Sequence, residues 1–105
     1  MKFGDNWGPT TWIFFHSLAE RVNEDSFTKM YPILIKIIKD ICGILPCPDC
    51  RAHSSSLLQS YRSYDSIITK DDFKNFIFHL HNYVNKHTGK RIENKTILNN
   101  YKNYS

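Results

Sequence analysis

The feature that most limits the fold of this 105-residue chain is a long segment in which apolar residues recur every three or four positions. It covers residues 27–45, and charged residues fill several of the intervening positions. Such spacing places the apolar side chains on one side of an α-helix, and other parts of the chain must cover that side. The apolar positions are Phe27, Met30, Tyr31, Leu34, Ile37, Ile38, Ile41, Ile44 and Leu45. Gly43 and Pro46 mark the end of this helix.

Start and stop signals divide the rest of the chain into further helices. Gly8-Pro9 begins a first helix, because proline fits the first turn, and Pro48 begins a third that runs toward Tyr61. Thr69 is the predicted N-cap of a fourth helix, which Gly89 ends. The core-facing residues of that helix are Phe73, Phe76, Ile77, Leu80, His81 and Val84. With a short helix near residues 95–101, we predict one all-α domain over residues 1–105, a four-helix bundle with a short fifth helix.

Charge and hydropathy narrow the class of protein. The net charge is +4, but the lysines are spread along the chain, so we expect no nucleic-acid partner. No apolar run is long enough for a signal peptide or a membrane span. We therefore expect an unexported, cytoplasmic protein in a reducing compartment, where structural disulfides are rare.

Two of the three cysteines, Cys47 and Cys50, lie three residues apart in the stretch LPCPDCRAH. A structural zinc site needs four ligands; the pair supplies two and His53 could supply a third, but no second CxxC follows. A thioredoxin-like pair follows a strand, whereas a helix is predicted before this one. An inert pair is a further alternative.

The local chemistry of the pair favours a redox role. If the third helix begins at Pro48, both sulfurs lie near its N-terminus, where free N–H groups and the helix dipole stabilise a thiolate. Arg51 adds a cation, and cysteines one turn apart can close a disulfide. A dithiol cannot dispose of two electrons alone, so the pair needs an acceptor.

Two other clusters indicate what that acceptor is. Trp12 and His16 are four residues apart on the first helix and share a face, as His81 and Asn85 do on the fourth. Taken singly, each cluster also fits a core tryptophan with a hydrogen-bonded histidine, or a solvated helix edge. Together they could enclose a flat ring system with polar edges, while Lys90 contacts a phosphate.

The order of these motifs resembles the Erv/ALR family of FAD-linked sulfhydryl oxidases. The shared pattern is W-G-P-x-x-W-x-x-x-H, then P-C-x-x-C, then H-N-x-V-N with a following G-K. It is carried by Trp7, Gly8, Pro9, Trp12, His16, Pro46, Cys47, Cys50, His81, Asn82, Val84, Asn85, Gly89 and Lys90. The match spans residues 7–90.

The resemblance implies a helical bundle that binds FAD and no metal, and an oxidase that passes electrons from dithiols to oxygen, forming hydrogen peroxide. It implies that Cys50 lies beside the flavin and that Cys47 exchanges with incoming thiols. The implied FAD site comprises Gly8, Thr11, Trp12, His16, His81, Asn82, Val84, Asn85 and Lys90. The alternative from another class is a small helical module that binds zinc or a partner without catalysis.

The chain also departs from the cellular members of that family. It has no tail cysteine pair, and Phe78 and His79 stand where those members carry an extra cysteine. It resembles instead the short members of large cytoplasmic DNA viruses. That likeness implies a protein dithiol substrate, such as a thioredoxin-like carrier, and a homodimer. Cys42 is predicted to be a buried thiol.

Overall fold

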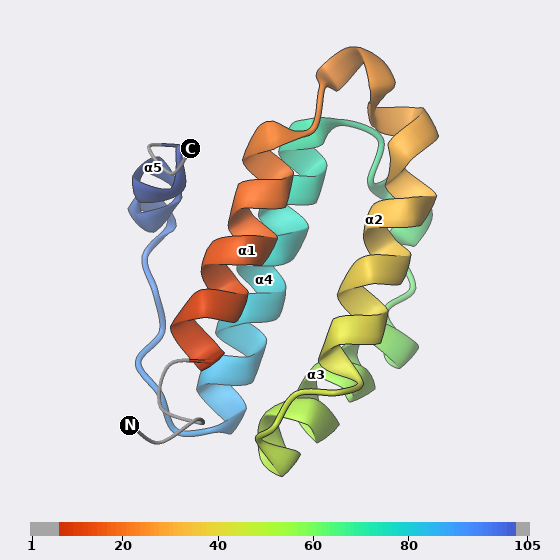
Figure 1. Cartoon of the computed structure of the whole chain (residues 1–105). Helices are drawn as coiled ribbons and strands as arrows, with labels where there is room; N and C mark the ends of the chain where they lie inside the picture. Colours follow the sequence, from red (N-terminus) through yellow and green to blue (C-terminus); the bar gives the residue numbers. More distant parts are fainter. Residues whose placement is uncertain (1–6, 103–105) are drawn as a thin grey trace.

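The structure, a computed structural model, describes residues 7–102, and this part of the chain is helical without a strand. Its main helices are α1 (Trp7–Arg21), α2 (Phe27–Cys42), α3 (Pro48–Ser60) and α4 (Lys70–His87). They form a bundle in which α4 packs on α1 and α3, and a short α5 (Leu98–Tyr101) lies against α1 (Figure 1). Single 3₁₀ turns occur at Glu24–Ser26, Tyr64–Ser66 and Lys95–Ile97. The predicted all-α bundle with a short fifth helix is confirmed.

The end of α2 differs from the sequence prediction. The apolar spacing continues to Leu45, but the helix ends at Cys42, and the N–H of Gly43 bonds back to Lys39 and Ile41. Leu45 still reaches the core, whereas Ile44, predicted on the apolar face, is 77% exposed. The prediction for Ile44 is wrong because the helical period stops applying once the backbone leaves the helix.

The other predicted helix ends are confirmed. Pro48 begins α3, and Thr69 and Asp72 form a reciprocal capping box at the start of α4, with bonds of 3.1 and 3.0 Å. Gly89 has a φ of 75°, a left-handed conformation that favours glycine. This turn brings the chain back along α4, so that the N–H of Lys90 bonds to the Asn85 carbonyl at 2.8 Å.

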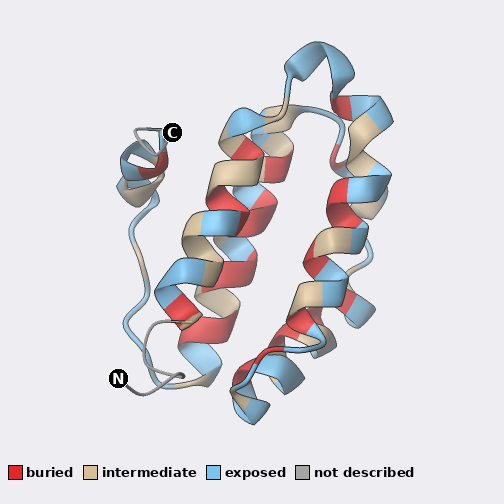
Figure 2. Cartoon of the chain, viewed as in Figure 1, coloured by how far each residue is buried: buried red, intermediate tan, exposed pale blue. Residues whose placement is uncertain are grey.

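The buried residues lie on the sides of the helices that face one another, and the exposed residues lie on the outside of the bundle (Figure 2). Large side chains fill it, and burying each one contributes roughly 1.5–3 kcal/mol. The largest fully buried apolar residues are Phe15, Phe27, Phe73, Ile38, Ile77 and Leu80. Between residues 7 and 102, none of the helices is long and apolar enough to cross a membrane.

Candidate active site

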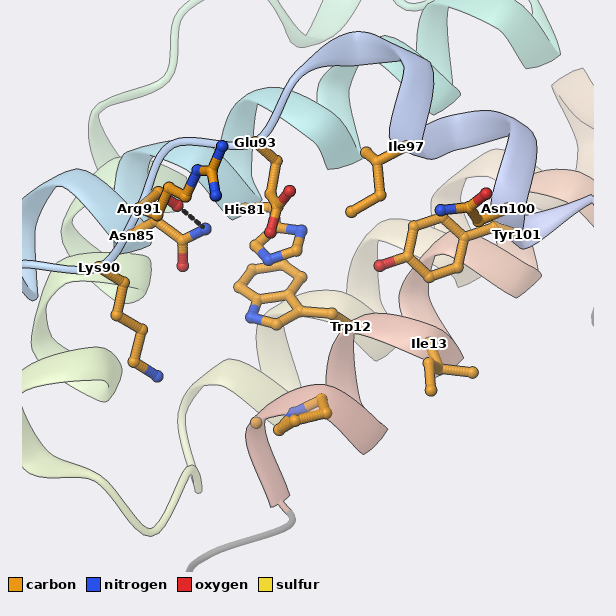
Figure 3. Close-up of a pocket in the computed structure, with 12 residues that line it drawn as sticks. Trp12, Ile13, His81, Asn85, Lys90, Arg91, Glu93, Ile97, Asn100 and Tyr101 are labelled. Carbon is orange, nitrogen blue, oxygen red and sulfur yellow. Dashed lines mark hydrogen bonds between the residues drawn. The ribbon is translucent and has the colours of Figure 1, made fainter.

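A cavity of about 370 Å³ lies between α1, α4 and the segment that leads into α5 (Figure 3). The α1 part of its wall is far in the sequence from the other two parts, and the turn at Gly89 directs the segment after α4 back over that helix. The residues that line it are Gly8, Pro9, Trp12, Ile13, His81, Asn85, Lys90, Arg91, Glu93, Ile97, Asn100 and Tyr101.

Four ring side chains form a ladder beside this cavity. The Trp12 indole stacks on the His81 imidazole, with ring centres 4.1 Å apart and planes 11° apart. His81 Nδ1 and His16 Nε2 share a hydrogen bond of 3.1 Å, and His16 stacks in turn on Tyr101, also at 4.1 Å. The ladder therefore joins α1, α4 and α5 through ring contacts.

Both histidines of the ladder are uncharged at neutral pH. Burial, with a smaller contribution from His81, lowers the pKa of His16 to about 3. Burial, with a smaller contribution from Lys90, lowers the pKa of His81 to about 4. A neutral imidazole has one donor and one acceptor nitrogen, so in the shared bond one ring donates and the other accepts.

Two asparagines fasten the third wall of the cavity to α4. The Asn82 carboxamide exchanges two bonds with the backbone of Glu93: Nδ2 donates to the carbonyl at 3.0 Å, and the Glu93 N–H donates to Oδ1 at 2.8 Å. Asn85 Nδ2 donates to the Arg91 carbonyl at 3.1 Å. Asparagine is a poor interior helix former, and these bonds explain why Asn82 and Asn85 occur within α4.

Two positively charged side chains, those of Lys90 and Arg91, lie at the same wall of the cavity. Lys90 Nζ lies 5.9 Å from the centre of the Trp7 ring and close to Gly8, where an added Cβ would come within 3.9 Å of it. Arg91 lines the cavity beside it. Guanidinium and ammonium groups together suit a ligand that carries phosphates.

The cysteine pair lies at the start of α3. Cys47 is the N-cap, and its Sγ accepts a hydrogen bond of 3.2 Å from the N–H of Cys50. Cys50 is buried, with 2% of its surface exposed, while Cys47 is half-buried. Only Cys47 is therefore open to attack by a thiol from outside. Cys42 is a buried thiol, as predicted.

The surroundings shift the pKa values of the two thiols in opposite directions. Desolvation raises the pKa of Cys47, but hydrogen bonds from the Cys50 thiol and from the N–H groups of Cys50 and Asp49 together outweigh it and lower the pKa. Burial, together with the bond to Cys47 and its charge, raises the pKa of Cys50 to about 11. Of the two thiols in the reduced pair, Cys47 is therefore the more acidic.

The cation that acts on Cys50 is Lys90, whose charge lowers the pKa of that thiol and so opposes the effect of burial. Arg51 was predicted to supply this charge, but its Nη1 donates to the Leu45 carbonyl at 2.9 Å. Because Lys90 also lines the cavity, one side chain connects the cysteine pair electrostatically to the cavity.

Some of the FAD-site residues predicted from the sequence line the cavity, and others lie behind its wall. Gly8, Trp12, His81, Asn85 and Lys90 line the cavity. His16 lies behind His81, Asn82 holds the backbone of Glu93, Val84 belongs to the core, and Thr11 is half-buried on α1 outside the cavity wall.

Sequence reasoning missed much of the wall, namely Pro9, Ile13, Arg91, Glu93, Ile97, Asn100 and Tyr101. The adjacent Lys90-Arg91 pair was a visible signal for a phosphate-binding wall. Among residues 7–102, no three histidine, cysteine or acidic side chains come together as a metal site. The ring of His53, the third zinc ligand considered above, packs against His87 with ring centres 5.0 Å apart.

Comparison with known proteins places the chain in a family. The Erv1 / Alr family matches residues 9–104. A protein named FAD-linked sulfhydryl oxidase ERV1 from Arabidopsis thaliana is 26% identical over 85 residues, which are 81% of this chain and 44% of that protein. Proteins named FAD-linked sulfhydryl oxidase from two African swine fever virus isolates are 31% identical over 87 residues, which are 83% of this chain and 71% of theirs. The chain thus spans less than half of the plant relative and most of the viral ones, and it belongs to the Erv1 / Alr family.

Proposed function

We propose that this chain is an FAD-linked sulfhydryl oxidase that converts protein dithiols into disulfides through Cys47 and Cys50. The observation that carries the proposal is the polarised cysteine pair, whose buried member is electrostatically coupled to a lysine in the wall of the cavity. Membership of a family whose relatives bear that name supports it.

The cavity suits part of an FAD molecule. The Trp12–His81 stack offers a flat ring surface, Asn85 offers an amide, and Lys90 and Arg91 offer charge for the diphosphate. Gly8 leaves the space beside the Lys90 ammonium free of a side chain. When bound, FAD accepts two electrons from a dithiol and passes them to oxygen, which yields hydrogen peroxide.

The residues of the chain itself account for the thiol chemistry. A substrate thiolate attacks the Cys47 sulfur of the Cys47–Cys50 disulfide, which forms a mixed disulfide and releases Cys50 as a thiolate. The second substrate thiolate then attacks the substrate sulfur of that bond and releases Cys47. The substrate loses two electrons and two protons, and the Cys47–Cys50 disulfide becomes a reduced pair of thiols.

The finer parts of the proposal concern partners and location. The half-buried Cys47 would accept a thioredoxin-like carrier, whose own reactive cysteine is exposed. Molecular oxygen is the final acceptor, the working form is a homodimer, and the compartment is the cytoplasm. These assignments follow from the resemblance to short viral members of the family, and two of the matched relatives are viral proteins.

One preparation tests the proposal. Purified protein should be yellow, with flavin absorbance, and should consume dithiothreitol while releasing one hydrogen peroxide for each disulfide formed. Colourless protein that contains zinc and leaves dithiothreitol unoxidised would contradict the proposal and favour the helical zinc-binding module.

A further inference from the structure

Ile44 is the most exposed large apolar residue among those that the structure describes, at 77%, and it lies three positions before Cys47. Pro46 and Pro48 are also exposed, whereas Leu45, the residue after Ile44, is buried. Exposed apolar residues therefore precede and follow Cys47 in the sequence of this turn. We call Ile44, Pro46 and Pro48 the apolar rim.

The backbone of this turn is held in place. The N–H groups of Gly43 and Ile44 donate to the carbonyls of Lys39 and Ile41, both at 3.1 Å. Arg51 fixes the Leu45 carbonyl from the opposite side at 2.9 Å. Because the rim is already ordered, contact with a partner costs little further conformational entropy.

The exchange reaction brings a substrate to this rim. In a mixed disulfide the two Cα atoms are about 4.4–6.8 Å apart. Three residues of chain span at most about 11 Å, so Ile44 lies within reach of the residues that flank the substrate cysteine. A residue next to the linked cysteine of the substrate can therefore contact Ile44.

We propose that the apolar rim selects protein substrates whose reactive cysteine has a neighbouring apolar side chain, with Ile44 as the main contact. This inference rests on the proposed function and specifies its substrate class. The occupant is the cysteine-bearing segment of the substrate, because apolar area that water covers in the free enzyme becomes buried in the mixed disulfide. Small dithiols lack such a neighbour and do not use the rim.

Two short synthetic peptides test this inference on the flavin-loaded enzyme. Both carry two cysteines separated by two glycines; leucines flank the cysteines in one peptide and serines in the other. The expected kcat/KM of the wild type is about tenfold higher for the leucine peptide, equivalent to about 1.4 kcal/mol of partial burial. Ile44→Ser should abolish that preference, and Ile44→Leu should keep it.

Matched controls separate docking from folding. Ile68→Ser replaces another isoleucine, 67% exposed and just before α4, and should keep the tenfold preference. Dithiothreitol turnover of Ile44→Ser should stay within about twofold of the wild type. A preference that survives in Ile44→Ser, or a parallel loss of dithiothreitol turnover, overturns the inference. A wild type that oxidises no dithiol would instead overturn the proposed function, and the inference with it.

Discussion

At the scale of single residues, the cysteines differ because their surroundings differ. Cys47 caps α3 and collects hydrogen bonds, while Cys50 is buried one turn further on. We predict that Cys47→Ser and Cys50→Ser each abolish dithiol oxidation and that Cys42→Ser leaves it largely intact, since Cys42 is buried beneath α3 with a pKa raised by burial to about 11. Oxygen consumption with dithiothreitol measures this. Turnover in either of the first two variants would exclude the pair as the redox centre.

Trapping a substrate on the wild-type protein locates the site of exchange. A substrate protein that lacks its second cysteine should be trapped as a mixed disulfide at Cys47, since Cys47 is the exposed member of the pair. Mass spectrometry of the linked peptides identifies the bond. A link at Cys42 would overturn the assignment of Cys47.

We predict that the charge of Lys90 lowers the pKa of Cys50. When Cys47 is absent, its hydrogen bond and charge no longer raise the pKa of Cys50, which leaves burial and the charge of Asp49 opposed by Lys90. In a Cys42→Ser, Cys47→Ser background, Lys90→Met should raise the pKa of Cys50, and Lys90→Arg should largely preserve it. Titration of the ultraviolet absorbance of the single thiolate measures the change.

Lys86→Met is the matched control, because it removes an exposed lysine from the last turn of α4. It should leave the titration of Cys50 unchanged. Equal curves for Lys90→Met and its parent would show that Lys90 has no influence on Cys50.

At the scale of elements, residues 90–94 form no helix and are held against α4 by hydrogen bonds from the side chains of Asn82 and Asn85. Asn82→Ala removes both bonds to Glu93, so we predict a loss of about 1–2 kcal/mol in the free energy of unfolding. Weaker flavin retention should accompany this loss, since Arg91 and Glu93 line the cavity. Denaturant unfolding and gel filtration with flavin absorbance measure the two effects.

Asn75→Ala provides the comparison for this change in the same helix, because Asn75 is exposed and lies outside the cavity wall. It carries the same gain in helix propensity without the loss of the two bonds. If both variants retain flavin and stability equally, Asn82 does not fasten the wall.

Helix boundaries show how far local sequence determines these elements. Pro48 and Thr69 begin α3 and α4 as predicted, because caps act through their immediate neighbours in the chain. The end of α2 was predicted less well, since the apolar spacing ran past Gly43 to residues that lie outside the helix. Ile44 fits the helical spacing although it lies beyond the end of the helix, and only the path of the backbone shows that its side chain faces water.

At the scale of the whole molecule, the cavity depends on contacts between distant segments. The motif residues on α1 and α4 were predictable because helical spacing alone puts Trp12 near His16 and His81 near Asn85. Arg91, Asn100 and Tyr101 were not, because their position follows from the turn at Gly89 and the docking of α5 on α1 (Figure 1). Tyr101 stacks on His16, which lies 85 residues earlier in the chain, and no local sequence pattern predicts this contact.

The buried histidine pair makes the stability of the whole molecule depend on pH. The pKa values of His16 and His81, about 3 and 4 in the folded protein, lie below their ordinary value of 6.5. Above pH 6.5 the two histidines are neutral in the folded and in the unfolded protein, so they do not change the free energy of unfolding. As pH falls below 6.5 only the unfolded chain gains protons, so folding should lose up to about 2 kcal/mol per histidine by pH 5. The loss should level off once the pH passes below the folded values.

His16→Gln tests this dependence, because glutamine can still hydrogen-bond to His81 but does not titrate. Unfolding by denaturant at pH 7 and pH 5 should show a markedly smaller acid destabilisation in this variant than in the wild type. His79→Gln, an exposed histidine on α4, should keep the wild-type difference between the two pH values. Other acidic and basic groups titrate alike in all three proteins and cancel in the comparison. An equal drop in stability for the wild type and His16→Gln would show that the buried pair takes no part in the response to acid.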